Sequence, residues 1–324
     1  MSDRWTISVC CVSALVGVLA APSTGAQTKG EVLRQGTAHE AVYDIALRGN
    51  EGIAVGALGD RFISADGGRT WSRAPQRLGD LALLAVALSE RDGLIVGQEG
   101  AIYRREGDLW KAVDSGTRQR LLNVALNDGG LAVAVGGFGT LLRSTDAGHN
   151  WQAVSLDWQA ILGDFLEPHL YDVTINANGV ITVVGEFELI LRSLDGGQEW
   201  QVVHKGEASI FALDLLEDGV GYAVGQNGLI LRTGDGGLHW APSDPGTGAN
   251  YLGVLVQEDG AVYATGIRSL VTSRDDGRSW QSLAVADITT GWYQALAGGT
   301  DGRIVTVGHH GQIVEISPSG GSTP

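Results

Sequence analysis

The sequence predicts an all-β protein, a seven-bladed β-propeller of four-stranded antiparallel blades, and three observations support this fold. A tryptophan closes successive units at intervals of 39, 41, 49, 40 and 40 residues, at Trp71, Trp110, Trp151, Trp200, Trp240 and Trp280. A glycine that ends a short apolar run recurs seven times, at Gly56, Gly97, Gly136, Gly185, Gly225, Gly266 and Gly308. The seventh unit lacks the tryptophan. Because one four-stranded unit cannot bury both of its faces, such units must pack against one another around a ring.

Each unit contains four short strand-like segments, and the fifth unit shows this pattern clearly. Apolar runs cover residues 210–215, 221–224 and 229–233, and a fourth strand begins at Trp240. The residues between these runs are mainly Gly, Asn and Asp, which favour the positive backbone angles of tight hairpin turns. Short strands separated by such turns predict an antiparallel meander in every blade.

The turn between the third and fourth strands carries the most specific local motif, Ser/Thr-x-Asp-x-Gly-x-x-Trp, which is the Asp-box. Five units contain it, with their aspartates and tryptophans at Asp66, Asp146, Asp195, Asp235, Asp275, Trp71, Trp151, Trp200, Trp240 and Trp280. We expect each Asp to accept hydrogen bonds from turn amides and each Trp to cover the hairpin. These ten residues are therefore predicted to be structural.

The incomplete seventh unit predicts how the ring is closed. Its third strand ends at residues 312–316, and no fourth strand follows it. Residues 31–37 resemble residues 111–117, the fourth strand of the second unit. We therefore expect residues 31–36 to pair with the last blade, because closure of this kind protects sheet edges that would otherwise promote aggregation.

One connection is about nine residues longer than the others and lies between the third and fourth blades. This insertion, residues 157–169, contains many apolar groups for a surface loop, with Trp158, Phe165 and Leu166 among them. It is expected to hold a short helical turn and to lie on the face opposite the Asp-boxes. A partner-facing or lipid-facing contact is one interpretation. The alternative is that the loop folds over the central channel or its own blade.

The N-terminal residues have the pattern of an export signal. Arg4 precedes an uncharged apolar run over residues 7–21, and small residues at 24–26 provide a cleavage site after Ala26. The run is short for a membrane span. The sequence thus predicts a secretory signal peptide over residues 1–26 and a mature domain over residues 27–324. An uncleaved anchor is the alternative.

The composition of the mature domain excludes several classes of site and partner. Cys10 and Cys11, the only cysteines, lie in the expected signal, and the residues before them do not match a lipidation motif. The mature domain would therefore hold no disulfide and no thiolate metal site. A formal net charge of −15 disfavours nucleic acid and anionic lipid surfaces as partners.

The repeat pattern Gly-x-x-Gly-x-Ile/Leu-x-Arg-Ser-x-Asp-Gly-Gly-x-x-Trp resembles the photosystem II stability/assembly factor family. The best matching stretches are residues 136–151, 185–200 and 225–240, and the resemblance extends over the mature domain. It implies an exported seven-bladed Asp-box propeller that assists membrane protein complexes and is not an enzyme. A periplasmic location, or one equivalent to the thylakoid lumen, is implied as well.

Arginines occupy the same position of the third strand in blades two to five, namely Arg104, Arg143, Arg192 and Arg232. The resemblance implies that they contribute to a protein-binding patch, which would suit a partner that bears carboxylates. The structural alternative is that each arginine pairs with a carboxylate or carbonyl of the neighbouring blade. Trp158 and Phe165 of the insertion complete the predicted partner-binding set.

No metal, cofactor or catalytic residue is expected. His309 and His310 lie in a turn of blade seven, and Glu186 and Glu188 lie in the corresponding turn of blade four. A metal site needs three or four convergent ligands, and blades this far apart would not bring these residues together. The sequence also contains no nucleophile elbow, zinc-protease helix or phosphate-binding loop.

The sequence therefore predicts a non-catalytic exported scaffold that binds a membrane protein or membrane-associated complex and aids its assembly, stability or operation. In an organism without photosystems, the client could be a transporter or exporter. The mature domain itself is not expected to span a membrane or bind nucleic acid. Two alternatives remain, a sialidase-like glycoside hydrolase and a carbohydrate- or lipid-binding envelope module.

Overall fold

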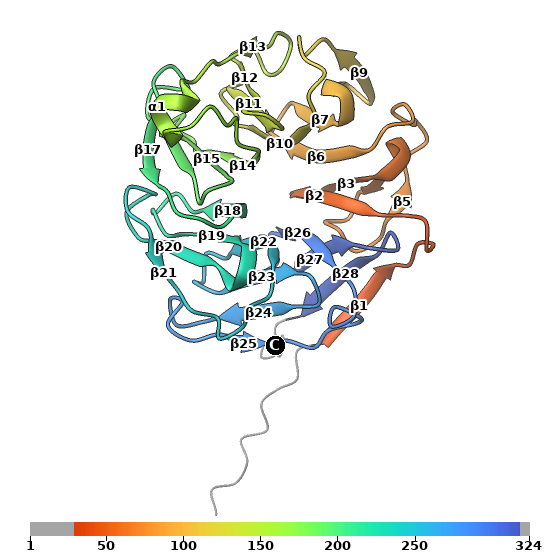
Figure 1. The fold of residues 1–324 in the computed structure, drawn as a ribbon. Helices are drawn as coiled ribbons and strands as arrows, with labels where there is room; N and C mark the ends of the chain where they lie inside the picture. Colours follow the sequence, from red (N-terminus) through yellow and green to blue (C-terminus); the bar gives the residue numbers. More distant parts are fainter. Residues whose placement is uncertain (1–28, 318–324) are drawn as a thin grey trace, which may run out of the picture.

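The computed structural model describes residues 29–317, and these residues form seven four-stranded antiparallel sheets arranged around a central channel (Figure 1). The predicted fold class is confirmed. The predicted signal peptide lies outside the described residues. No helix within residues 29–317 is both long and apolar enough to cross a membrane.

The strands of each blade follow one another outward from the channel. The innermost strands are β2 (Val42–Arg48), β6 (Leu83–Leu88), β10 (Leu121–Leu126), β14 (Leu170–Ile175), β18 (Ile210–Leu215), β22 (Tyr251–Val256) and β26 (Tyr293–Gly298). The second strands are β3 (Glu51–Gly56), β7 (Gly93–Gly97), β11 (Ala132–Gly136), β15 (Ile181–Gly185), β19 (Gly221–Gly225), β23 (Val262–Gly266) and β27 (Ile304–Gly308).

The outer strands complete the blades. The third strands are β4 (Arg61–Ser64), β8 (Ile102–Glu106), β12 (Leu141–Ser144), β16 (Ile190–Ser193), β20 (Ile230–Thr233), β24 (Leu270–Ser273) and β28 (Ile313–Ser317). The fourth strands are β5 (Ser72–Arg73), β9 (Leu109–Val113), β13 (Gln152–Ala153), β17 (Gln201–His204), β21 (Ala241–Pro242), β25 (Gln281–Ser282) and, for the last blade, β1 (Lys29–Arg34). Short helices are η1 (Ala57–Gly59), η2 (Gln98–Gly100), η3 (Gln226–Gly228) and α1 (Trp158–Leu162).

The second strands form the centre of each blade-to-blade interface, which explains their uninterrupted apolar sequences. Every residue of β11 is buried, as is every residue of β15. The side chains on both faces of these strands contact neighbouring blades, so the hydrophobic core is a series of clusters around the ring. A strand that is covered on both faces cannot alternate between apolar and polar residues.

The recurring glycine at the end of each second strand has a steric cause. A Cβ atom placed on Gly136 would lie 2.1 Å from the carbonyl oxygen of Arg120, the residue that precedes the innermost strand β10. The same approach to a backbone carbonyl, at 2.0 to 2.4 Å, occurs at the other six glycines of the repeat. Only glycine allows the two strands to meet this closely, because any side chain would overlap the backbone.

The N-terminal strand closes the ring, as predicted. In β1, Glu31 pairs with Glu315 of β28 and Val32 pairs with Val314, in antiparallel register. The strand covers residues 29–34 rather than the expected 31–36. It ends at Arg34, whose guanidinium turns back to donate to the carbonyl of Gly311 and to the carboxylate of Glu40.

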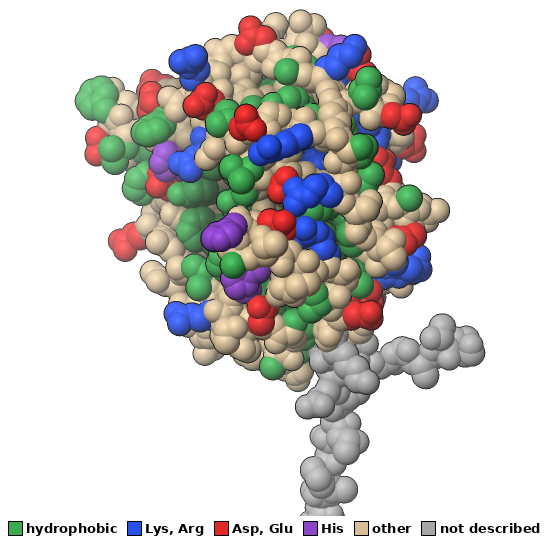
Figure 2. Space-filling model, turned by 90° about the vertical axis from the view of Figure 1, so that its right-hand side faces the viewer, with side chains coloured by type: hydrophobic (Ala, Val, Ile, Leu, Met, Phe, Trp, Pro, Cys, Tyr) green, Lys and Arg blue, Asp and Glu red, His purple; other side chains and the backbone are tan. Residues whose placement is uncertain are grey.

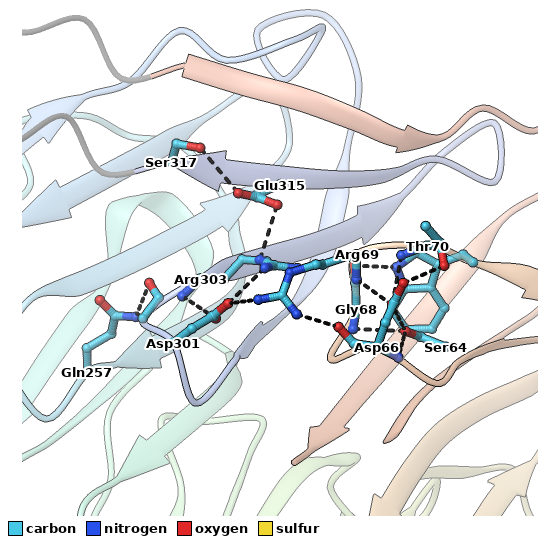
Figure 3. A network of polar contacts seen from close by, with 12 residues as sticks. Ser64, Asp66, Gly68, Arg69, Thr70, Gln257, Asp301, Arg303, Glu315 and Ser317 are labelled. Atoms are coloured by element: carbon cyan, nitrogen blue, oxygen red, sulfur yellow. Dashed lines mark hydrogen bonds and ion pairs between the residues drawn. The ribbon is translucent and has the colours of Figure 1, made fainter. Parts of the chain in front are cut away.

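A second connection links the first and last blades on the side of the Asp-boxes (Figure 3). Arg69 of the first box lies 2.7 Å from Asp301, in the turn between β26 and β27. Asp301 also pairs with Arg303 at 2.8 Å, and Arg303 pairs with Glu315 of β28 at 3.3 Å. The ring is therefore closed both by strand pairing and by a chain of charged side chains.

Candidate functional site

The Asp-boxes form closed hydrogen-bonded turns. In the third blade, Ser144 Oγ donates to Asp146 Oδ1 at 2.7 Å, and the backbone N–H of Gly148 donates to Ser144 Oγ at 3.0 Å. The N–H of Asn150 donates to Asp146 Oδ1 at 2.9 Å. Trp151 Nε1 donates to the carbonyl of Gly148 at 3.1 Å. The carboxylate thus holds the turn, and the indole fixes the strand that follows it.

These bonds favour the ionised form of the box carboxylates. The Ser279 hydroxyl and backbone N–H, followed by the Ser273 hydroxyl, lower the pKa of Asp275 to about 2. At Asp146, burial raises the pKa, but the side chain and N–H of Asn150 outweigh it and lower the pKa to about 2. The pKa of Asp195 is lowered as well, chiefly by the N–H of Glu199. Hydrogen bonds donated to a carboxylate stabilise its charge.

The four arginines of the third strands each reach the Asp-box loop of the next blade. Arg104 Nε donates to the carbonyl of Ala147 at 2.9 Å. Arg143 Nε donates to the carbonyl of Gly196. These are the contacts that the structural alternative predicts, and they extend from each blade to its successor.

Arg192 and Arg232 also extend from their own blade to the Asp-box loop of the next blade, but they contact different groups there. Arg232 Nε donates to Asp276 Oδ1 at 2.8 Å. The guanidinium of Arg192 lies beside Gly236 and Gly237 of the fifth blade, and burial lowers its pKa. Within residues 29–317, Arg104 and Arg232 pair with a carboxylate, whereas Arg143 donates to a carbonyl only.

Acidic and basic side chains are interspersed on the side of the ring that Figure 2 shows, and no large region there carries charge of one sign only. Hydrophobic side chains lie between them in small groups. One cause of this mixing is pairing within and between blades. Arg105 lies 2.6 Å from Glu51 and Arg73 lies 2.8 Å from Glu40.

The insertion between blades three and four is divided into a packed half and an exposed half. Its helix α1 begins after Asp157, whose carboxylate accepts from the N–H of Ala160 at 3.0 Å. Trp158 packs with Ile161 and Leu162 against the core of blades three and four. Phe165, by contrast, is 81% exposed.

The exposed half lies beside the turn between β11 and β12. The N–H of Gly139 donates to the carbonyl of Pro168 at 2.8 Å, which places the insertion on the face of the second-to-third strand turns. In the same turn Phe138 is 58% exposed and makes an edge contact with His169, with ring centroids 5.0 Å apart. Phe138 was not predicted from the sequence, because its turn shows no feature beyond one exposed aromatic residue.

Three aspartates that the sequence analysis missed line the central channel. A cavity of about 390 Å³ is bordered by residues of all seven innermost strands, including Asp44, Asp172 and Asp214. Each carboxylate accepts from a backbone N–H of the next blade: Asp44 from Val86 at 2.8 Å, Asp172 from Leu213 at 2.8 Å and Asp214 from Val256 at 2.7 Å. An Asp within a strongly apolar strand is the signal that could have identified them.

Burial of these three carboxylates disfavours their charge. It raises the pKa of Asp44 to about 7, of Asp172 to about 8 and of Asp214 to about 6, against the opposing effect of the N–H donors. Asp44 and Asp214 raise the pKa of Asp172 further by mutual repulsion. The side chains face the channel and are partly buried, so the surrounding strands replace part of their water.

The histidine turn of blade seven meets a residue that the sequence analysis did not consider. Asp287, in the connection between β25 and β26, offers a carboxylate oxygen near ring nitrogens of His309 and His310, with all three atoms within 4.8 Å of one another. Glu186 and Glu188 lie elsewhere. Glu186 accepts from the N–H of His169 at 2.8 Å, and Glu188 pairs with His204 at 3.2 Å.

Comparison with known proteins supports the expected resemblance. The model of the photosynthesis system II assembly factor YCF48 family matches residues 104–208, and the BNR/Asp-box repeat model matches residues 62–73. The photosystem II stability/assembly factor HCF136 of the Arabidopsis thaliana chloroplast is 32% identical over 109 residues, which span 32% of this chain and 27% of that protein. The matched segment is thus about a quarter of the relative's length.

Solved structures share the fold. YCF48 bound to a D1 peptide is 18% identical with a TM-score of 0.69, and covers 90% of this chain and 96% of its own. YCF48 from Cyanidioschyzon merolae is 19% identical with a TM-score of 0.71, at 89% and 98% coverage. A virginiamycin B lyase from Staphylococcus aureus is 12% identical with a TM-score of 0.74, at 90% and 99% coverage. These likenesses establish the propeller, which hosts many unrelated functions.

Proposed function

We propose that this protein, a propeller similar to the photosystem II assembly factor family, is a non-catalytic exported scaffold that binds a segment of a membrane protein complex. Its role would be to aid assembly, stability or operation of that complex. Where no photosystem is present, we propose a transporter or exporter as the client. Support comes from the family match and from a fold neighbour, YCF48, whose structure holds a D1 peptide.

The observation that carries this proposal is the position of the matched segment. Residues 104–208 contain the apolar insertion and three of the four arginines of the third strands. Phe165 and Leu166 of the insertion are 81% and 52% exposed, and the neighbouring Phe138 is 58% exposed. Clustered exposed apolar side chains are typical of protein-binding surfaces. We therefore assign client contact to Phe165 and Phe138, with Trp158 holding the insertion in place.

The arginines form the second part of the proposed surface. Arg104 and Arg232 already pair with carboxylates of this chain. Arg143 contacts only a carbonyl within the described residues, so its charge is available to a client carboxylate. Arg192 is more buried and contributes at longer range. A planar guanidinium suits a carboxylate ligand.

We expect Phe165→Asp and Phe138→Asp to abolish co-purification with a client from detergent-solubilised membranes. Each change places a charge in an apolar contact, which is typically worth 2 kcal/mol or more at the centre of an interface, roughly a 30-fold loss of affinity. Pull-down followed by mass spectrometry measures this loss.

Leu58→Asp is the matched control for Phe138→Asp. Leu58 lies in the corresponding turn of blade one, is 57% exposed and has a φ of 56°, against 58% and 53° for Phe138. Its substitution should leave the pull-down unchanged. Equal loss in both variants, or in neither, would contradict the assignment of the insertion as the client-binding surface.

Replacement of Arg143 and Arg192 by Glu should also abolish the pull-down, with only a small fall in melting temperature, because neither pairs with a carboxylate of this chain within residues 29–317. Reversal of both charges repels a client carboxylate. Far-UV circular dichroism during heating provides the second readout. A collapse of the melt would instead assign these residues to blade packing, and the client-binding role of the arginines would be lost.

A hydrolase is less well supported. The channel cavity is bordered by no arginine among the described residues, whereas a sialidase-like site needs arginines that converge on a substrate carboxylate. Turnover of a sialoside or another glycoside, abolished by changing one carboxylate, would favour the hydrolase over the scaffold. Retention on a carbohydrate or lipid matrix would favour the binding-module alternative.

A further inference from the structure

A cavity of about 720 Å³ lies between blades six and seven, on the face of the second-to-third strand turns. Its lining comes from four parts of the chain. The segment before β2 contributes His39 and Glu40, the turn between β23 and β24 contributes Arg268, and the connection before β26 contributes Asp287. The histidine turn between β27 and β28 completes the wall.

The ligand geometry within this cavity resembles a metal site. His309 Nε2 lies 3.2 Å from Asp287 Oδ2. For a zinc ion with bonds of about 2.1 Å to nitrogen and oxygen, two ligand atoms at a tetrahedral angle are about 3.4 Å apart. His310 supplies a third ligand atom within 4.8 Å of the other two. The three residues could therefore surround one ion without rearrangement of the backbone.

The carboxylate is held so that one oxygen faces the histidines. Tyr293 Oη donates to Asp287 Oδ1 at 2.6 Å. Tyr293 is fully buried, so its hydroxyl is held in this position by the surrounding core. Oδ2 faces His309 Nε2 at 3.2 Å and accepts a long hydrogen bond from Gln312 Nε2 at 3.5 Å. Hydrogen bonds of this kind to a ligating carboxylate orient metal ligands.

The imidazole of His309 is held in place by its neighbours, and its Nε2 atom has no hydrogen-bond partner with good geometry among the described residues. Its Nε2 is buried and makes no hydrogen bond within the described residues, because the nearby carboxylate is close but poorly aligned. The ring contacts Tyr293 edge-on, with centroids 5.4 Å apart. A Cβ on Gly291 would lie 1.8 Å from Nε2, so glycine is required for the imidazole to occupy this place.

We propose that Asp287, His309 and His310 bind one divalent transition-metal ion, with Zn²⁺ as the preferred ion and a fourth position open to the cavity. Two imidazoles and one carboxylate suit Zn²⁺ and its neighbours in the first transition series, whereas Ca²⁺ and Mg²⁺ prefer oxygen ligands alone. The acidic protein also attracts cations. The ion would link the turn before β28 to the connection before β26, next to the strand that closes the ring.

The test is calorimetric titration of the untagged, chelator-treated protein with ZnCl₂. We expect one equivalent to bind, and the melting temperature to rise with Zn²⁺ because the ion binds the folded state only. His310→Gln and Asp287→Asn should each weaken binding by at least ~10-fold. His310 is exposed, so its substitution tests the site even where the Asp287 variant folds poorly.

His239→Gln is the matched control, because His239 forms another histidine–carboxylate pair, at 2.6 Å from Asp235, outside the cluster. It should leave the affinity unchanged. Co²⁺ provides a second readout, since four-coordinate cobalt has an intense visible absorption that Gly291→Ala should remove by displacing His309. Absence of zinc binding, or equal affinity in the wild-type protein and the His310 and Asp287 variants, would overturn the proposal.

Discussion

The outer rim and the central channel both present repeated aspartates, and the two sets have opposite electrostatic behaviour. At the rim, Asp146 and Asp275 accept hydrogen bonds from a hydroxyl or amide side chain and from backbone N–H groups, and their pKa falls to about 2. In the channel, Asp172 and Asp44 also accept from backbone N–H groups, yet their pKa rises to about 8 and about 7. The same residue type is therefore ionised at the rim near neutral pH, whereas in the channel its titration is shifted towards neutral pH.

The difference shows which physical effect dominates in each place. A rim carboxylate keeps much of its water, so that each hydrogen bond adds to the stability of its charge. A channel carboxylate is surrounded by the seven innermost strands, and loss of water outweighs the one or two N–H groups that it faces. The same repeated fold thus creates two environments, one at the rim and one at the ring axis, in which different effects dominate.

The strongest test of this comparison is the pH dependence of stability. Each channel aspartate has a folded-state pKa above its unfolded value of 3.8, so the folded protein binds more protons between pH 4 and pH 8. The free energy of unfolding should be highest near pH 4 and fall as pH rises through 6, 7 and 8. We expect the melting temperature to fall by roughly 5 °C or more across this range, and Asp44→Asn, Asp172→Asn and Asp214→Asn together to flatten the profile.

A control is needed because net negative charge also destabilises a folded protein at high pH. Neutralisation of three exposed carboxylates, at Asp108, Glu167 and Glu258, changes the formal net charge by the same three units as the channel variant, from −15 to −12. This control should retain the slope of the wild-type profile. A profile that is equally flat in both triple variants would show that overall charge, rather than the channel, sets the slope.

A smaller effect is expected at the rim. Asp275→Ala removes the acceptor for the N–H of Ser279 and for the hydroxyls of Ser273 and Ser279. The folded-state pKa of Asp275 is below its unfolded value, so its contribution is present above pH 4 and lost as pH falls towards 2. Urea denaturation at pH 7 should give a lower midpoint for the variant than for the wild-type protein, and this difference should disappear near pH 2.

Asp275→Asn separates charge from hydrogen bonding in the same box. The amide retains one acceptor oxygen, so its penalty should be smaller than that of Ala. An equal penalty for the Ala variant at pH 7 and pH 2 would contradict the assignment of this carboxylate as an ionised turn acceptor.

The fold could be predicted because its signals recur in every blade. The glycine of each second strand is imposed by a backbone carbonyl that would overlap any Cβ, and the box tryptophan is fixed by the hairpin it follows. The closing strand was predicted at residues 31–36 and lies at residues 29–34. Sequence similarity could not show that the strand ends at Arg34, whose guanidinium donates to Gly311 and Glu40.

The functional features were harder to predict because they do not follow the repeat. Asp287 lies in an irregular connection and meets the histidine turn only through the packing of the last blade. Asp172 is the single charged residue of its strand, and its neighbours across the channel belong to other blades. Phe138 has the same turn position as Leu58 of blade one and Phe187 of blade four, and the sequence does not show that Phe138 is exposed. No sequence motif within a single repeat unit marks Asp287, Asp172 or Phe138.

The pairing of β1 with β28 has a consequence for biosynthesis. Lys29 pairs with Ser317, its partner 288 positions further along the chain. An unfinished polypeptide leaving the ribosome would hold β1 without its partner until residue 317 had been made, and a contact of such long range slows folding. Completion of the last blade thus requires that β28 has been synthesised. Any prematurely terminated product would display the unprotected edge of its last sheet, a feature that proteases and chaperones can recognise.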